Sequence, residues 1–255
     1  MAFHPSPFVL ANSRHGTLIL SHLDHSPAGD NLRMAGVGLR LLLTGSLDET
    51  EIATGRTLLD WRRAAYGDGC FAIDCGANIG VMTIEWSKHM QKWGNVLAFE
   101  MQRRVFYACA GNIAIHNCFN ADVQWAAVGK LDGEVDAPVL DYTKPASIGS
   151  LGLTPQEDVG QAIAGHEKVR ALRLDSLGLA RLDLLKIDVE GAELDVLAGA
   201  TETIRRCKPY IMAERLKSGG LQDSLAALGY ASGLAEKNIL AMPADDPNWA
   251  KIKMS

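Results

Sequence analysis

The sequence predicts an α/β protein built on a doubly wound, mostly parallel sheet. Short apolar runs that are typical of buried strands alternate with segments of helical periodicity. The first clear strand runs into a Gly-rich turn, "DCGANIG", and then into a helical pattern, as in α/β folds that bind nucleotides. The length of 255 residues, with 47% hydrophobic and 22% charged residues, suits one large α/β domain or two small ones.

Residues 1–66 are expected to form an N-terminal cap that packs on a main domain at residues 67–255. Two apolar stretches, "PFVLAN" and "GTLILSHL", predict a pair of strands, because "NSRHG" between them has turn chemistry. Residues 47–66 predict a helix, with Asp48 and Glu49 at the end where the helix dipole stabilises acids. The cap is too short to bury a good core of its own.

The main domain begins with alternating strands and helices, and residues 130–168 then interrupt the pattern. The expected elements before the interruption are a strand at 70–74, a helix through Ile79, Met82, Trp86 and Met90, a strand at 95–100, a helix at 103–117 and a strand at 121–129. The interruption has three prolines and five glycines, which predicts a substrate-side insertion, partly strand and partly loop. The expected elements after it are a strand at 182–191, a helix at 192–207, a strand at 209–216, a helix at 221–230 and a closing strand at 238–243.

Composition and charge exclude several classes of function. The formal net charge of −5 gives no electrostatic basis for binding nucleic acid. The N-terminal residues lack a signal-peptide pattern and no apolar run approaches the ~20 residues of a membrane span, so a cytoplasmic protein without a membrane partner is expected. The five cysteines form no CxxC pair, and His22, Asp24 and His25 are expected to form a solvated turn instead of a metal site. The oligomeric state stays open, with a homodimer among the alternatives.

The turn after the first strand of the main domain contains Asp74, Gly76, Asn78 and Gly80. The glycines permit a tight turn and a close approach of the backbone to a ligand, but their spacing differs from the dinucleotide fingerprint GxGxxG. A carboxylate at Asp74 would repel a pyrophosphate and suits a cationic ligand. Glu100 ends the next strand, where a carboxylate can bind both hydroxyls of a ribose. Together the two acids predict S-adenosylmethionine, although each alone could be a helix cap or a solvated strand end.

The segment "LLKIDVEGAEL" places charged side chains in an otherwise apolar strand. Lys186, Asp188 and Glu190 alternate with apolar residues, so they share one face of the predicted strand. Because Gly191 ends that strand, the two acids are expected at the carboxyl edge of the sheet, where such folds bind ligands. Glu193 would lie in the first turn of the next helix, and capping is an alternative role for Glu190 and Glu193.

These segments resemble the FkbM-type family of S-adenosylmethionine-dependent methyltransferases. The matching words are "IDCGANIG", "LAFE", "GNIAIHN", "LDSLGLARLDLLKIDVEGAELDVLAGA" and "PYIMAE". The combination of GANIG with KIDVEGAE is the specific part of the resemblance. It implies a class I methyltransferase fold, which is a Rossmann-like, seven-stranded sheet that ends in an antiparallel hairpin. It also implies O-methylation, often of sugar or polyketide-type hydroxyls.

By position, the resemblance also implies a cofactor site. The residues that look like the family's methionine-side cofactor loop are Asp74, Gly76, Asn78 and Gly80. Glu100 looks like its ribose ligand, and Asn112 matches an Asn in the next helix of the family, which adds Asn112 to the expected cofactor-binding residues. Met101 is a departure, because the family commonly has a proline after the glutamate.

Asp188, Glu190 and Glu193 match the family's acidic cluster. An alcohol is a poor nucleophile, so a base within hydrogen-bond reach should help, and either Asp188 or Glu190 could accept the hydroxyl proton. Lys186 could lower the pKa of a carboxylate or hold an oxygen of the acceptor. A divalent metal that orients a diol is an alternative. The chain offers no further obvious oxygen ligands, so no metal site is expected.

The expected substrate is a small-molecule or glycan hydroxyl acceptor, with a pocket formed by residues 130–168 and the N-terminal cap. An NAD-dependent oxidoreductase with a Rossmann-like fold is the alternative function, because it shares the first half of the fold and the acid after the second strand. Asp74 and the missing central glycine argue against it. A non-catalytic module is a third alternative, although a scaffold would not need three carboxylates at a ligand-binding edge.

Overall fold

The computed structural model describes residues 6–25, 36–153, 162–215 and 219–252. Its centre is a seven-stranded sheet in the order β11-β12-β10-β9-β3-β4-β5. These strands are β3 (Cys70–Cys75), β4 (Gly94–Glu100), β5 (Ala121–Trp125), β9 (Leu184–Ile187), β10 (Tyr210–Glu214), β11 (Tyr230–Ala235) and β12 (Asn238–Pro243). Neighbours from β10 to β5 pair in parallel, and β12 and β11 add an antiparallel hairpin. The predicted doubly wound, mostly parallel sheet is therefore confirmed.

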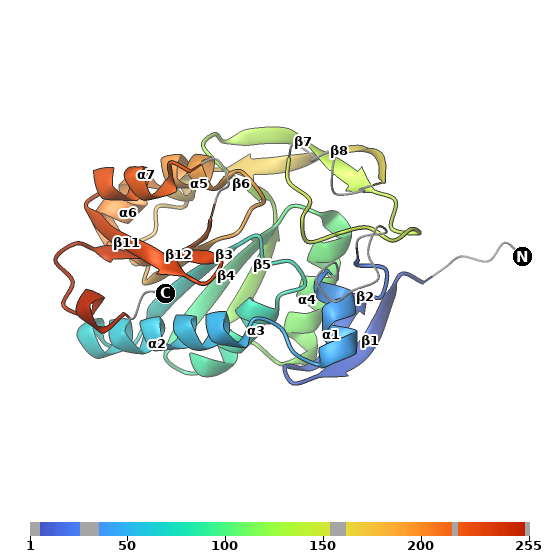
Figure 1. The fold of residues 1–255 in the computed structure, drawn as a ribbon, viewed down its shortest axis with the longest axis horizontal. Coiled ribbons are helices and arrows are strands. Elements are labelled where there is room, and N and C mark those ends of the chain that lie inside the picture. The colour runs from blue at the N-terminus through green and yellow to red at the C-terminus, as the bar shows by residue number, and fades with distance from the viewer. Residues whose placement is uncertain (1–5, 26–35, 154–161, 216–218, 253–255) are drawn as a thin grey trace, which may run out of the picture.

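Helices cover both faces of this sheet (Figure 1). One layer contains α2 (Glu49–Tyr66), α3 (Val81–His89) and α4 (Arg103–Ile115), and the other contains α5 (Glu193–Gly199), α6 (Thr201–Cys207) and α7 (Leu221–Ala227). Successive strand side chains point to opposite faces, so each face has its own core. Leu184 belongs to the same apolar core as Trp86 of α3. Leu185 belongs to the core that contains Val196 of α5.

The N-terminal segment divides between two places. The hairpin of β1 (Phe8–Ser13) and β2 (Gly16–Ser21) packs on α4, and α1 (Val37–Thr44) contacts both strands of the hairpin. In contrast, α2 packs on α3, β3 and β9, so it is part of a helical layer of the main sheet. The hairpin and α1 therefore pack together beside α4, and α2 lies with the helices of the main sheet.

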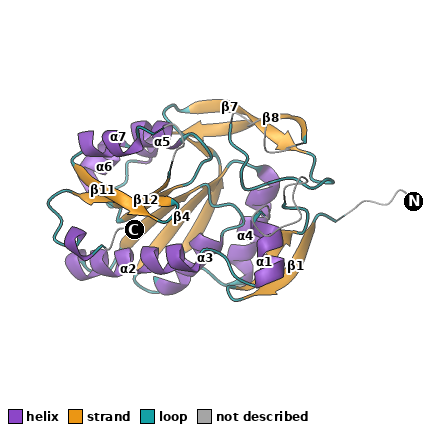
Figure 2. Cartoon of the chain, viewed as in Figure 1, coloured by secondary structure: helices purple, strands orange, loops and turns teal. Residues whose placement is uncertain are grey.

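A second, three-stranded sheet follows β5 and has the order β6-β8-β7 (Figure 2). Its strands are β6 (Ala127–Val128), β7 (Gly133–Leu140) and β8 (Ile163–Leu172). The strand predicted at 121–129 is wrong in its second half, because the chain leaves the main sheet at Ala126. The described residues of the insertion are partly strand and partly loop, as expected. Two short 3₁₀ helices complete the described elements, η3 (Leu174–Leu177) and η4 (Trp249–Lys251).

Other boundaries differ from the prediction for local reasons. The strand predicted at 182–191 ends at Ile187, because Glu190 and Gly191 have φ angles of 55° and 104°, which are not strand angles. The helix predicted at 192–207 is broken at Ala200 into α5 and α6. Neither α1 nor β11 is predicted from the sequence. None of the helices in the described ranges is both long and apolar enough to span a bilayer.

Candidate active site

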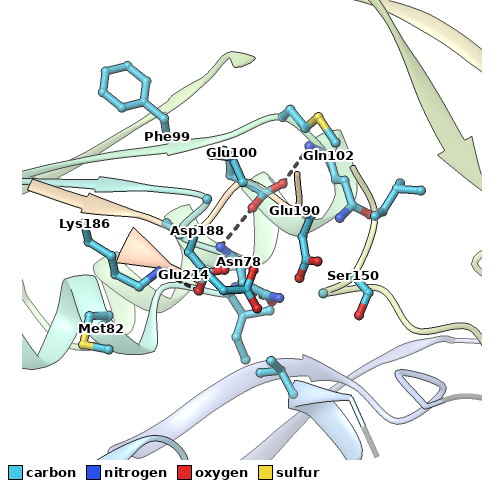
Figure 3. A pocket seen from close by; sticks show the side chains of 18 of the residues that line it. Asn78, Met82, Phe99, Glu100, Gln102, Ser150, Lys186, Asp188, Glu190 and Glu214 are labelled. Carbon is cyan, nitrogen blue, oxygen red and sulfur yellow. Dashed lines mark hydrogen bonds and ion pairs between the residues drawn. The ribbon is translucent and has the colours of Figure 1, made fainter. Parts of the chain in front are cut away.

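A cavity of about 550 Å³ lies at the carboxyl ends of β3, β4, β9 and β10 (Figure 3). The residues that line it include the turn after β3, the ends of β4 and β10, and the segment after β9. Residues of α1 and of the first turn of α2 also line it, together with Ser147, Gly149, Ser150, Leu151 and Leu153 of the insertion. Segments distant in the sequence thus meet at the edge of the sheet where the sequence predicts a ligand.

The turn after β3 is held against β4 by its own backbone. Gly76 and Ala77 donate their N–H groups to the carbonyl oxygen of Phe99, both at 3.0 Å. Gly76 has a φ of 79°, and a Cβ there would lie 1.8 Å from the Asp188 carbonyl oxygen, so the position requires glycine. Gly76 and Asn78 both line the cavity.

Glu100 ends β4 and faces the cavity with a buried carboxylate. Its Oε2 accepts the N–H of Asn78 at 2.9 Å, and its Oε1 accepts the N–H of Gln102 at 2.8 Å (Figure 3). Burial raises the pKa of Glu100 to about 7, although these N–H groups lower it. Two backbone bonds fix the orientation of the carboxylate and leave other lone pairs for hydroxyl donors.

Asp74 and Gly80 do not line the cavity. The carboxylate of Asp74 is fully buried, where it accepts a hydrogen bond from Thr83 Oγ1 at 2.7 Å and pairs with Lys186 Nζ at 3.4 Å. The expected contact between Asp74 and a cationic ligand is therefore not what the geometry offers; Asp74 orients Lys186 instead. Gly80 begins α3 with a φ of 85°, and a Cβ there would lie 2.7 Å from Cys109 Sγ, so its role is close packing.

Asn112 is also a structural residue. Its side chain is completely buried and bonds the backbone of the N-terminal hairpin and of the turn before α3. Oδ1 accepts the N–H of Ile19 at 2.6 Å, and Nδ2 donates to the carbonyl oxygens of Ile19 and Ile79 at 3.0 and 2.8 Å. Asn112 lies in the helix after Glu100, as the sequence predicts. Both polar atoms of its amide already bond backbone groups, so the amide is not available to a ligand in the cavity.

We expect Asn112→Ala to lower the free energy of unfolding by about 2–4 kcal/mol, because three buried hydrogen bonds are lost. Urea unfolding would measure this change. The folded variant should bind S-adenosylhomocysteine with wild-type affinity in calorimetry. Lost binding in a folded variant would instead return Asn112 to the cofactor site.

Three carboxylates and one lysine meet on the other side of the cavity. Asp188, Glu190 and Glu214 have carboxylate oxygens within 4.8 Å of one another, and all three line the cavity (Figure 3). Lys186 Nζ donates to Asp188 Oδ2 at 3.0 Å. Lys186, Asp188 and Glu190 are thus brought together as predicted, although Asp188 and Glu190 lie after the strand and not within it.

The environment separates the proton affinities of these acids. Burial raises the pKa of Glu190 to about 8, and the neighbouring carboxylates of Glu214 and Asp188 add to the effect. Burial and Asp188 also raise the pKa of Glu214, to about 7. For Asp188, burial favours the neutral form, but the adjacent Lys186 ammonium outweighs it and lowers the pKa. At neutral pH Asp188 is ionised and paired with Lys186. Glu190, in contrast, takes up and releases its proton near pH 8.

Glu193 stabilises the turn that presents Glu190. Its Oε1 accepts the N–H groups of Val189 and Gly191, both at 3.1 Å, and its side chain is fully buried. Glu190 itself has a φ of 55°, a left-handed conformation that is uncommon for residues other than glycine. Capping, the alternative left open for Glu193, describes its contacts, and Glu190 is the acid that the turn exposes.

Several residues that line the cavity are not predicted from the sequence. Glu214 ends β10, so the same rule that identified Glu100 at the end of a strand could have identified it. Two ion pairs, Lys237 with Glu51 (3.0 Å) and Arg40 with Asp48 (2.8 Å), also line the cavity. These residues come from three distant segments, and no local pattern indicates that they meet.

The raised pKa of Glu190 predicts a pH-dependent stability. In the folded protein this pKa is about 8 against an ordinary value of 4.5, so the folded state binds the proton more tightly. The resulting stabilisation is complete below about pH 4 and is lost as the pH rises through about 8. We therefore expect Glu190→Gln to match wild type at about pH 4 and to be more stable at about pH 8.5, by on the order of 2 kcal/mol. Thermal unfolding at both pH values measures this, and an equal difference at both would contradict it.

Comparison with known proteins adds independent information. Residues 74–227, more than half of the chain, match the family described as Methyltransferase FkbM domain. "Methyltransferase 1" of Beauveria bassiana (strain ARSEF 2860) is 29% identical over 206 residues, which are 73% of this chain and 78% of that protein. "Methyltransferase sdnD" of Sordaria araneosa is 26% identical over 187 residues, which are 62% of this chain and 71% of that protein.

One solved structure agrees on the fold. The crystal structure of a methyltransferase FkbM from Methylobacillus flagellatus KT superposes with a TM-score of 0.51 at 17% identity. The match covers 69% of this chain and 44% of that chain, so this chain corresponds to less than half of the other protein. Such a likeness shows the fold alone, and it agrees with the class I methyltransferase topology of the seven-stranded sheet. Because the family model matches more than half of the chain, the chain belongs to the FkbM family of methyltransferases.

Proposed function

We propose that this methyltransferase transfers a methyl group from S-adenosylmethionine to a hydroxyl of a small molecule, sugar or natural-product intermediate. The observation that supports this proposal most strongly is the composition of the cavity. It combines a buried carboxylate on one strand end, Glu100, with a second acid, Glu190, whose pKa is about 8. The first suits a ribose and the second suits a general base.

The residues at the end of β4 fit an adenosine-bearing donor. Glu100 offers carboxylate oxygens for the ribose hydroxyls, and Met101, Ala127 and Val128 add apolar surface to the cavity for a flat base. The turn through Gly76 places its backbone at the cavity, where it can approach the methionine part of the donor. The donor, when bound, supplies a methyl carbon that is already activated for displacement.

In this proposal Glu190 accepts the proton of the acceptor hydroxyl. The acceptor oxygen forms a bond to the methyl carbon, the bond between that carbon and sulfur breaks with its electron pair going to sulfur, and the proton moves to the carboxylate. A base is most effective when its pKa lies near the working pH, which favours Glu190 over Asp188. Lys186 and Asp188 form an ion pair at 3.0 Å, which fixes the positions of both charged groups beside the proposed base.

A test of the acceptor chemistry is a screen of hydroxyl-bearing compounds with labelled S-adenosylmethionine, followed by nuclear magnetic resonance of the product. The proposal predicts a new methyl signal on oxygen in sugars or polyols. A methyl group on nitrogen, carbon or a carboxylate would contradict the assignment of a hydroxyl as the acceptor. Reduction of NAD by such compounds without methyl transfer would support the oxidoreductase alternative.

Removal of divalent metal is expected to leave turnover unchanged. The carboxylates of Asp188, Glu190 and Glu214 lie close enough to hold a cation. However, Lys186 already compensates the charge of Asp188, and a base must stay free of metal to take a proton. Turnover should therefore be equal with EDTA and with added Mg²⁺. Activity that is lost in EDTA and restored by Mg²⁺ would make the three acids a metal site instead.

A further inference from the structure

Residues 146–153, which we name the loop wall, lie against both sides of the candidate active site. Gly149 approaches the turn after β3 so closely that a Cβ would lie 2.9 Å from Asn78 Nδ2. Gly152 approaches the turn of the proposed base, where a Cβ would lie 2.3 Å from the carbonyl oxygen of Glu190. Ser150 lies beside Glu190 and lines the cavity (Figure 3). The loop wall therefore spans from the donor side to the acceptor side.

Ile148, in the middle of the loop wall, is held by two buried side chains. Its N–H donates to Asp24 Oδ1 at 2.8 Å, and its carbonyl oxygen accepts from Gln102 Nε2 at 2.8 Å. Asp24 is 3% exposed and Gln102 is 7% exposed. The loop wall has no helix or paired strand of its own beyond a single bridge at Ala146, so its backbone polar groups need other partners, and these two side chains bond both backbone groups of Ile148.

Asp24 lies in the turn after β2, and its carboxylate connects this turn to α1 and to the loop wall. Its Oδ2 accepts the N–H of Gly38 at the start of α1, at 2.9 Å, while Oδ1 holds Ile148. The adjacent Leu23 accepts the N–H of Ala146 at 3.0 Å. The solvated turn predicted around Asp24 is wrong, because the carboxylate is buried and its oxygens are used by backbone donors.

Gln102 connects the loop wall to the proposed donor site. Its backbone N–H donates to Glu100 Oε1 at 2.8 Å, and its side-chain Oε1 accepts the hydroxyl of Tyr142 at 3.0 Å. Because its Nε2 donates to Ile148, one residue ties the acid of the donor site to the covering loop.

We propose that Asp24 and Gln102 are positioning residues that hold the loop wall closed over the donor site and slow the release of the spent donor, S-adenosylhomocysteine. This inference rests on the proposed function, because it takes the donor site to be at Glu100. A loop fixed by two side-chain anchors opens locally when one anchor is lost, since the remaining bonds no longer oppose its conformational entropy.

Two near-isosteric variants remove one anchor each. Asp24→Asn keeps the size of the side chain but sets an amide NH₂ against a backbone N–H. Gln102→Glu keeps the backbone bond to Glu100 and the bond from Tyr142, but it turns a carboxylate oxygen toward the carbonyl of Ile148. The matched control is Asp245→Asn, because Asp245 is exposed and does not line the cavity.

The experiment uses the full chain and two readouts, hydrogen exchange of the amides at 146–153 and stopped-flow release of S-adenosylhomocysteine. Each variant loses one buried hydrogen bond to Ile148. We expect amide exchange and S-adenosylhomocysteine release each to become roughly tenfold faster or more in both variants, and to stay unchanged in the control. Unchanged exchange, or faster exchange with unchanged release, would overturn the inference. If Asp24→Asn does not fold, Gln102→Glu alone decides. A wild-type chain that binds no S-adenosylhomocysteine would overturn the proposed function itself.

Discussion

Glu190→Gln is expected to lower kcat for methyl transfer by roughly 10²–10⁴-fold, the range for loss of a general base. Glutamine has nearly the same shape but takes no proton at neutral pH, so the acceptor hydroxyl keeps its proton in the transition state. The affinity for S-adenosylhomocysteine should stay close to wild type, because Glu100 and the turn after β3 are unaffected. Steady-state kinetics and calorimetry measure the two quantities.

The pH profile separates this role from a merely structural one. Because the pKa of Glu190 is about 8, kcat of the wild type should rise with pH through about 8 and level off above it. The residual activity of Glu190→Gln should be independent of pH over this range. Asp188→Asn is the comparison variant, since the pKa of Asp188 is lowered and the residue is paired with Lys186. Normal turnover in Glu190→Gln, together with loss of turnover in Asp188→Asn, would make Asp188 the base.

Glu100→Ala is expected to weaken binding of S-adenosylhomocysteine by roughly 10²–10⁴-fold, since two hydrogen bonds to a charged acceptor are worth about 1.5–3 kcal/mol each. The carboxylate is oriented by the N–H groups of Asn78 and Gln102, and alanine has no oxygen atoms to offer the ribose hydroxyls in its place. Calorimetry on the folded variant measures the loss. Glu134→Ala is the matched control, because Glu134 is exposed on β7. Equal affinity in Glu100→Ala and wild type would place the donor elsewhere.

Much of the fold follows from local pattern. The alternation of apolar strands with helical stripes is strong wherever an element is buried on one side or both, as in β3, α3 and β4, and there the prediction is confirmed. It fails where a backbone angle decides the boundary. The strand through Lys186 stops at Ile187 because Glu190 and Gly191 turn the chain, although the apolar alternation continues through Val189.

The candidate site was predictable where one strand end supplies the chemistry. Glu100, Asp188 and Glu190 follow strands of the same sheet, so parallel pairing brings them to one edge. Asp74 and Asn112 show the limit of this reasoning. They also lie near that edge, but their side chains point into the protein, and the sequence does not record which way a polar side chain turns. The anchors of the loop wall depend on contacts across more than forty residues of chain, which no local signal reveals.

The most direct test of the central claim is calorimetry of the wild-type chain with S-adenosylmethionine, S-adenosylhomocysteine and NAD. The cavity beside Glu100 predicts micromolar binding of the first two and no binding of NAD. Binding of NAD with no binding of S-adenosylhomocysteine would contradict the account, because the turn after β3 would then hold a pyrophosphate, and the acids at Asp188 and Glu190 would need a different chemistry.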